Sequence, residues 1–258
     1  MQRFTRGITW LRGSLEHMFW GLLGLALLIL AWHAAVVFGR LPDIVLPSPM
    51  AVVAEMARRP DLLLHNAMVT LREILIGFGL AIAVGFPIAI AISFSQPLRR
   101  IIYPLLIVSN AIPKVAIAPL FLLWLGFGET TDISIALLVA VFPIVINTTL
   151  GLTEVSQELV RLGRIMGGSR WRVFWKIRFP SALPSIFAGL KVSMSLATVG
   201  AVVGELVAGE AGLGYLTQFA AGQLQTTLVF AAIVSLSILG VLLFYAIAAI
   251  EALAIQWK

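Results

Sequence analysis

Two ionisable residues, Lys114 and Glu205, lie within or at the end of long apolar stretches of this 258-residue chain. A charge at the centre of a bilayer costs about 2.5 to 3.5 kcal/mol on insertion scales, so both residues are candidates for a transport pathway. Lys114 follows Pro113 in a stretch that Pro104 and Pro119 also interrupt, and broken backbone is tolerated at membrane depth where it faces protein or water. The alternative interpretation is that Lys114 reaches the interface or pairs with a carbonyl group, and that Glu205 reaches the outer interface.

The residue types that most enzymes need are missing or scattered. The sequence has no cysteine, and its three histidines, at 17, 33 and 65, fall at no metal-ligand spacing. Neither a G-x-S-x-G nucleophile motif nor a G-x-x-x-x-G-K-[ST] phosphate loop occurs. The glycine-rich run GEAGLG at 209–214 is expected to be a turn. We therefore expect no catalytic residue, no metal site and no nucleotide bound by this chain.

Composition indicates a membrane protein. Hydrophobic residues make up 60% and charged residues 12%, and the mean hydropathy is +1.02. So few charges cannot cover the surface of a soluble enzyme of this size. A bilayer core requires about 20 uncharged residues per helix. Six stretches meet this requirement, and the sequence predicts an all-α integral membrane protein, a single domain over 1–258, with spans at about 18–38, 68–94, 101–124, 132–151, 186–208 and 228–251.

The distribution of cations fixes the expected orientation, because cytoplasmic loops carry an excess of Lys and Arg. With both termini in the cytoplasm, the outer side holds only Arg40, Arg58 and Arg59. The net charge of +6 is thus mainly a topology signal. A cleavable signal peptide is the weaker interpretation of the N-terminus, since the uncharged run that begins at His17 exceeds the length of a signal core. The cytoplasmic side holds Arg3, Arg6, Arg12, Arg99, Arg100, Arg161, Arg164, Arg170, Arg172, Lys176, Arg178 and Lys258.

The outer loop from 39 to 66 contains the sequence Leu-Pro-Ser-Pro at 46–49. Ser48 is expected to cap a short helix that begins at Pro49. The apolar residues Met50, Val53 and Ala57 then share one face, which predicts a helix lying on the membrane surface. This helix is interpreted either as a simple connector or as a contact for an extracytoplasmic partner.

The inner loop, roughly 152–184, contains the most informative pattern. Thr153 is a candidate N-cap with Glu154 in the first turn, and Gly167 and Gly168 are expected to end the helix. A helix of two or three turns cannot bury an apolar stripe by itself, so this stripe must meet the chain's own spans or another protein. The stripe follows at spacings of four, three and four residues: Val155, Leu159, Leu162 and Met166.

A second inner helix is expected after Ser169, which is another candidate N-cap, with its exit into the fifth span marked by Pro180 and Pro184. The loop carries six cations and no anion between 161 and 178. Such a loop suits a partner with acidic edges or an inner leaflet of anionic lipid, and nucleic-acid binding is not expected. The aromatic side of the second helix consists of Trp171, Phe174 and Trp175.

The run RLGRIMGGSRWRVFWKIRFPSALP at 161–184 resembles the cytoplasmic loop of permease subunits of ABC importers. The resemblance extends over about 40–251 and includes LPSP at 46–49, IPKVAIAPLFLLWLGFG at 112–128 and GLGYL at 212–216. It is closest to the nitrate, sulfonate and taurine class, which includes carriers of pyrimidine and flavin precursors.

This resemblance implies a permease fold of the type I importer kind in the bacterial cytoplasmic membrane. It implies a second permease subunit, expected to form a homodimer, two cytoplasmic ATPase subunits that use ATP and Mg²⁺, and an extracytoplasmic solute-binding protein. No cofactor is expected on this chain, which contacts membrane lipid. The loop residues implied to contact the ATPase are Leu159, Arg161, Leu162, Arg164, Met166, Gly167, Gly168, Ser169 and Arg170.

This chain departs from the family pattern at two positions of the loop. Arg161 stands where an acidic residue is usual, and Gly163 replaces the second alanine. Glu158, about one turn earlier, is the nearest acidic residue that could replace the usual one.

Two other function classes stay open. A secondary transporter would use Lys114 and Glu205 for ion coupling, but its alternating access would depend on internal repeats, and none is found. An intramembrane enzyme would need a nucleophile and a base placed together. Gly200 and Gly204 form a G-x-x-x-G pair, which favours close helix packing within the subunit or across a dimer seam.

Overall fold

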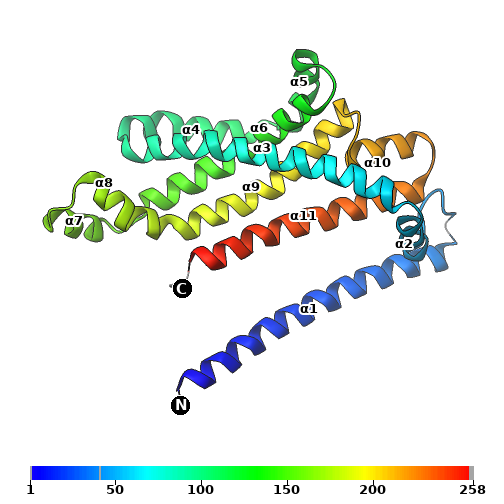
Figure 1. Cartoon of the computed structure of the whole chain (residues 1–258), viewed down its shortest axis with the longest axis horizontal. Coiled ribbons are helices and arrows are strands. Elements are labelled where there is room, and N and C mark those ends of the chain that lie inside the picture. The colour runs from blue at the N-terminus through cyan, green and yellow to red at the C-terminus, as the bar shows by residue number, and fades with distance from the viewer. Residues whose placement is uncertain (1, 41, 256–258) are drawn as a thin grey trace. The chain divides into compact units, whose positions relative to one another are not determined.

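The computed structural model describes residues 2–40 and 42–255, and Lys258 of the cytoplasmic cations lies outside the described residues. The described chain is helical, and no strand occurs in it (Figure 1). The helices, in chain order, are α1 Gln2–Gly39, α2 Pro49–Arg58, α3 Pro60–Phe94, α4 Gln96–Ala111, η1 Lys114–Ile117, α5 Ala118–Leu125, α6 Glu129–Thr153, α7 Gln157–Ile165, α8 Arg170–Val173, η2 Phe174–Arg178, α9 Phe179–Ala208, α10 Leu213–Gly222 and α11 Thr226–Ala254.

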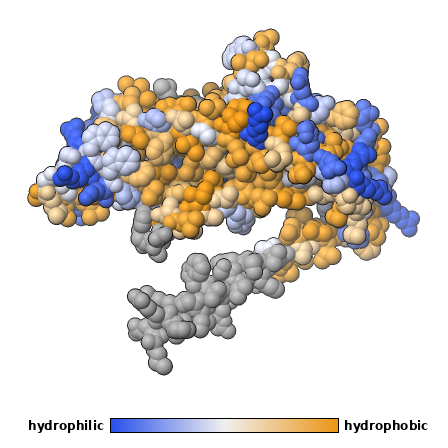
Figure 2. All heavy atoms as spheres, viewed as in Figure 1, coloured by the Kyte–Doolittle hydropathy of each residue, from blue (hydrophilic) through white to orange (hydrophobic). Residues whose placement is uncertain are grey.

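Four helices in the described residues are long and apolar enough to cross a membrane. They are α3, α6, the continuous helix formed by α8, η2 and α9, and α11. These four contain the second, fourth, fifth and sixth predicted spans, and α1 contains the first. Apolar residues cover the middle of the long helices in Figure 2, whereas polar residues gather at α7 and α8. This distribution is the one that a bilayer imposes on a helical protein.

The third predicted span, at about 101–124, is not one helix, which agrees with the broken backbone expected around its prolines. The chain forms α4, breaks at Ile112 and Pro113, and continues as η1 and α5. Ile112 is extended, with φ −73° and ψ 126°, because a residue before proline is pushed out of the helical region. Pro104 lies inside α4 without ending it.

The chain divides into two compact units. The first unit contains α2, where Ser48 Oγ accepts a hydrogen bond from the Ala51 N–H at 3.2 Å, and this confirms the predicted cap. Met50 and Val53 of α2 are exposed. Trp32 Nε1 donates to the carbonyl of residue 47 at 3.1 Å within the same unit. The first unit consists of Met1–Pro60 and Ala220–Ala231, and the second of Asp61–Phe219 and Ala232–Lys258.

The core of the second unit is built around α6 and α9, which pack against each other along their length. A Cβ atom added to Gly200 would lie 2.7 Å from Ala136 Cα, and one added to Gly204 would lie 2.6 Å from Asp132 Cα. The G-x-x-x-G pair therefore lies against α6 of the same subunit, where small residues let two backbones approach closely. The Ser193 hydroxyl of α9 also donates to a backbone carbonyl of α6, that of residue 140, at 2.7 Å.

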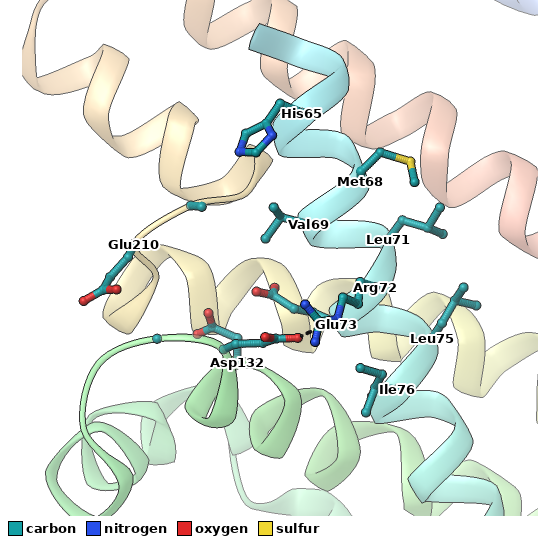
Figure 3. A pocket seen from close by; sticks show the side chains of 13 residues that line it. His65, Met68, Val69, Leu71, Arg72, Glu73, Leu75, Ile76, Asp132 and Glu210 are labelled. Atoms are coloured by element: carbon teal, nitrogen blue, oxygen red, sulfur yellow. Dashed lines mark ion pairs between the residues drawn. The ribbon is translucent and has the colours of Figure 1, made fainter. Parts of the chain in front are cut away.

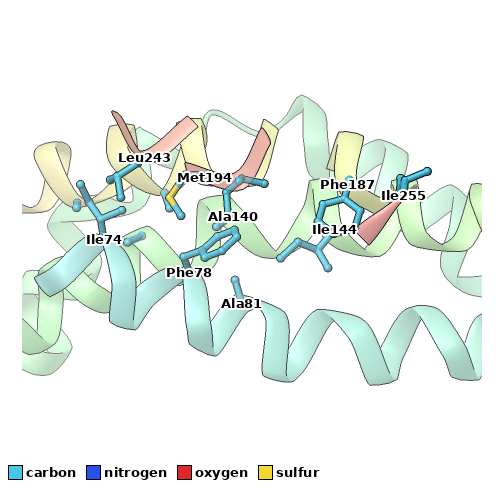
Figure 4. Packing of buried hydrophobic residues seen from close by; sticks show 13 residues of the cluster. Ile74, Phe78, Ala81, Ala140, Ile144, Phe187, Met194, Leu243 and Ile255 are labelled. Atoms are coloured by element: carbon cyan, nitrogen blue, oxygen red, sulfur yellow. The ribbon is translucent and has the colours of Figure 1, made fainter. Parts of the chain in front are cut away.

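Large apolar side chains fill the space around this helix pair (Figure 4). Phe78 of α3, Ile144 of α6, Phe187 and Met194 of α9, and Leu243 of α11 belong to one buried cluster. Four helices from distant parts of the sequence thus share one core, which fixes the relative positions of their inner and outer ends.

Candidate functional site

The inner loop folds into a short hairpin of α7 and α8, which we name the coupling hairpin, residues 157–173. Its first helix begins later than predicted. Thr153 does not cap α7, because Thr153 Oγ1 donates to the Thr149 carbonyl at 2.8 Å inside the last turn of α6. The residue before α7 is Ser156. The helix that the sequence placed after Thr153 thus starts three residues further on, at Gln157.

The turn between the two hairpin helices has the predicted glycine geometry. Gly167 has φ +79°, in the left-handed region that favours glycine. The Gly168 N–H donates to the Gly163 carbonyl at 3.0 Å, which closes the C-terminal end of α7. Ser169 Oγ then accepts from the Arg172 N–H at 3.2 Å and caps α8. Both helix ends are therefore fixed by local bonds.

The apolar stripe of the coupling hairpin is divided between two environments. Val155 is buried with Val160 and Val173 in one small cluster, so the expectation that Val155 shares a face with the rest of the stripe is wrong. The other three members are 49%, 54% and 79% exposed, and they follow one another along α7 to its C-terminal end: Leu159, Leu162 and Met166. One apolar face of α7 is thus left without cover in this chain.

Aromatic side chains hold the coupling hairpin to the membrane helices. Phe174 is 1% exposed, and its ring centroid lies 5.0 Å from that of Phe94 at the end of α3. Trp171 packs on the Phe94 ring at 5.6 Å, and Trp175 contacts Phe174 at 5.1 Å. Of the predicted aromatic side, only Phe174 is buried.

The coupling hairpin continues directly into the fifth span. The chain runs through α8, η2 and α9 as one helix, so the exit into the fifth span that Pro180 and Pro184 were predicted to mark is continuous helix. Pro180 lies in the first turn of α9, and Pro184 lies inside it. η2 is a π-helical turn shortly before Pro180, and such a turn adjusts the bonding where a proline N–H is missing. The coupling hairpin and the fifth span therefore share one continuous helix.

At the other end of α9, Glu205 caps the start of α10. Its side chain is 1% exposed, and Glu205 Oε2 accepts a hydrogen bond from the Gly214 N–H. Thr70 Oγ1 accepts from the N–H of residue 213 at 2.9 Å, and Asn66 Oδ1 accepts from the Gly212 N–H at 2.9 Å. Gly212 has φ +108°, as expected of a turn. Side chains from α3 and α9 thus satisfy the first amides of α10.

A cavity of about 780 Å³ lies beside this cap (Figure 3). Its polar lining includes Glu73 of α3 and Asp132 of α6, which are 2% and 1% exposed. At its edge Arg72 forms an ion pair with Glu129 at 3.2 Å. Within the described residues, Asp132 Oδ1 and Glu73 Oε2 accept no hydrogen bond. This cavity, which we name the outer acidic cavity, thus has buried carboxyl oxygens available to donors.

The two charged candidates from the sequence occupy different surroundings. Glu205 is buried and belongs to the cap of α10. Lys114 Nζ lies 4.5 Å from the centroid of the Phe142 ring on α6, within the range of a cation–π contact. Lys114 does not line the outer acidic cavity.

The acidic and polar groups near Glu205 were missed by sequence reasoning. A signal was present in α3, where Asn66, Thr70 and Glu73 follow at spacings of four and three and therefore share one face. Sequence reasoning also found no partner for Lys191. Lys191 Nζ forms an ion pair with Glu251 Oε2 at 2.8 Å, between α9 and α11.

These features define an integral membrane protein whose helical core carries an exposed inner hairpin and an outer polar cavity. Residues 78–255 match the family described as binding-protein-dependent transport system inner membrane component. The chain belongs to this family, and it is a permease subunit of an ABC importer of the inner membrane. The family consists of transport proteins rather than enzymes.

Several relatives cover most of the chain. It is 38% identical over 251 residues to the riboflavin transport system permease protein RibX of Chloroflexus aurantiacus, covering 95% of this chain and 94% of that one. It is 34% identical to the formylaminopyrimidine transport permease protein ThiX of Halalkalibacterium halodurans, covering 83% and 86%. It is 28% identical to the taurine transport system permease protein TauC of Escherichia coli, covering 90% and 87%.

A solved structure shares the fold. One chain of the MetNI methionine ABC transporter in an inward-facing conformation aligns with a TM-score of 0.66 at 20% identity, covering 75% of this chain and 96% of that chain. This similarity supports the fold and carries no information on substrate.

Proposed function

We propose that two copies of this chain form the pathway of an ATP-driven importer, and that the coupling hairpin binds the ATPase subunits. The uncovered apolar face of Leu159, Leu162 and Met166 carries this proposal. An amphipathic helix with such a face typically inserts into a groove of a partner. ATP and Mg²⁺ act in the partner ATPase and not on this chain.

The path of movement follows from the continuity of α8, η2 and α9. Closure of the ATPase dimer displaces the coupling hairpin, and α9 carries the displacement to Glu205 at its outer end. Because Glu205 caps α10, the outer face of the subunit changes together with the inner face. The two states differ in their affinity for the ATPase conformations, and ATP shifts the population between them.

The outer acidic cavity favours a neutral or cationic heterocycle over an anionic solute as substrate. Glu73 and Asp132 present carboxyl oxygens to the cavity, and its arginine, Arg72, is already paired with Glu129. A sulfonate would meet acidic groups here, whereas ring N–H and amino groups would find acceptors. The relatives named for riboflavin and formylaminopyrimidine are also more similar to this chain than the one named for taurine.

Exposed charged side chains of α7 are proposed as further contacts with the ATPase, and two other partners are proposed from the resemblance to the family. Arg161 is exposed on α7 and stands where an acidic residue is usual in this class. Glu158 is exposed about one turn earlier on the same helix. An extracytoplasmic solute-binding protein delivers the substrate, and the second permease copy completes the pathway.

The test uses vesicles that contain the permease with its ATPase and its binding protein, and it measures ATPase binding together with ATP-driven uptake. Leu162→Glu places a charge on the uncovered face. Gly167→Pro removes the turn, because proline cannot adopt the φ of +79° that the turn requires. We expect both variants to insert into the membrane and to lose ATP-driven uptake.

The matched control is Met50→Glu, which places the same charge on an exposed apolar residue of α2. This variant should keep the wild-type affinity for the ATPase, whereas Leu162→Glu should lose it. Normal uptake by both hairpin variants would refute the coupling role.

A further inference from the structure

A second cavity, of about 290 Å³, lies where the coupling hairpin meets the junction of α3 and α4. Two polar side chains, Ser93 and Gln96, lie at this junction. We call the cavity the arginine pocket, because four arginines from four elements line it: Arg99, Arg164, Arg170 and Arg178.

The arginine pocket has no anion of its own among the residues that the structure describes. Its lining contains no carboxylate, and none of its four arginines forms an ion pair with a described residue. Like charges gathered around one cavity repel one another, and an anion in the cavity removes that repulsion. The planar guanidinium group donates several hydrogen bonds in a fork that matches the oxygens of a phosphate group.

The position of Arg164 on α7 separates this pocket from the uncovered apolar face. Successive residues of a helix are about 100° apart, so Arg164 lies roughly opposite Leu159, Leu162 and Met166. Val160, on the same side as Arg164, is buried. A protein bound to the uncovered face of α7 would therefore leave the arginine pocket free.

The surroundings of the pocket indicate the membrane boundary. Phe94, the last residue of the spanning helix α3, lines the pocket and contacts Trp171. Trp171 is 61% exposed and Trp175 53% exposed. Tryptophan is typical of the interface between lipid and water. The predicted cytoplasmic side faces the leaflet that carries anionic headgroups.

From these observations we propose that the arginine pocket binds the phosphate group of an anionic phospholipid of the inner leaflet. The bound phosphate bridges α4, both helices of the coupling hairpin and η2. It thereby holds the hairpin against the ends of α3 and α4. Movement of the hairpin then depends on the bound lipid.

The experiment compares two double variants of the full-length permease, purified and placed in nanodiscs. Arg99→Gln with Arg170→Gln removes two pocket arginines. Arg100→Gln with Arg172→Gln removes the same charge from the same helices, α4 and α8, but from residues that do not line the pocket. Retention of phosphatidylglycerol against phosphatidylcholine is measured by native mass spectrometry.

The wild type and the control variant are expected to retain phosphatidylglycerol, and the pocket variant to bind it about tenfold more weakly or worse. Equal loss in both variants would mean a diffuse surface charge and would overturn the proposal. Displacement of the lipid by millimolar inorganic phosphate without any preference for the lipid would assign the pocket to free phosphate instead. Unchanged lipid retention in the pocket variant, with loss of ATPase binding, would assign it to the partner.

A second pair of substitutions keeps the test decisive if the pocket variant does not fold. Arg99→Lys with Arg170→Lys preserves the charge and removes the planar fork. The proposal predicts weaker phosphatidylglycerol retention than in the wild type, and retention equal to the wild type would contradict it.

Discussion

Glu205 Oε2 accepts a hydrogen bond from the Gly214 N–H, so the outer end of α9 caps the first turn of α10. A carboxylate at a helix N-terminus is favourable because it meets unpaired amides and the positive end of the helix dipole. The same helix begins, at its inner end, next to the coupling hairpin. Inner and outer faces of the subunit are thus linked through a single helix.

Removal of this cap is expected to loosen the start of α10. In Glu205→Ala the Gly214 amide loses its hydrogen bond and is left buried without an acceptor, which costs about 1 to 3 kcal/mol. Hydrogen exchange of the peptide that contains residues 212–216 should accelerate, while exchange in α6 stays unchanged. The control is Glu210→Ala, because Glu210 is exposed and should change neither. Unchanged exchange in Glu205→Ala would mean that the bond contributes nothing to the cap.

The close approach of α6 and α9 makes a second prediction. In Gly204→Ala the new Cβ atom would lie 2.6 Å from the Asp132 Cα, which is backbone and cannot move aside. Overpacking of this kind costs about 1 to 3 kcal/mol, and the melting temperature of the purified permease should fall.

The matched control for this substitution is Gly79→Ala in α3. No atom lies within 4 Å of a Cβ added at Gly79, and alanine is favoured over glycine in a helix by about 1 kcal/mol. The melting temperature should stay the same or rise. A similar fall in melting temperature in both variants would show that packing of Gly204 against α6 is not the cause of the destabilisation.

The ion pair of Lys191 and Glu251 provides a third prediction. The two side chains are 25% and 18% exposed, so removal of one partner leaves a poorly solvated charge and costs about 3 kcal/mol. Lys191→Met should therefore destabilise the permease more than Lys191→Met combined with Glu251→Leu. Thermal melting of both single variants and the double variant measures the coupling. Additive losses would exclude a direct interaction between the two charges.

Local sequence signals predicted the local structure well. Ser48 and Pro49 start α2 because the cap and the proline act within one turn, and Gly167 ends α7 because φ +79° favours glycine. The positions of four long spans followed from the absence of charge over some 20 residues.

Features that depend on tertiary packing could not be predicted. Thr153 and Ser156 are both able to cap a helix, and α6 continues to Thr153 where Leu152 is packed in the core. Pro180 was expected to mark the exit of the second inner helix into the fifth span, and the π-helical turn before it joins the two without a break. The grouping of Glu73 with Glu205 requires the register of α3 against α9, which no local pattern contains.

The most direct test of ATPase binding by the coupling hairpin is cysteine labelling, because the chain has no cysteine of its own. Leu162→Cys places a single thiol on the uncovered face of α7, and Met50→Cys places one on α2. The rate of maleimide labelling is measured for each variant in membranes, with and without the ATPase subunits. The account predicts that the ATPase slows labelling of the Leu162→Cys variant at least about tenfold and leaves the Met50→Cys variant unchanged. Equal labelling of the Leu162→Cys variant with and without the ATPase would contradict it.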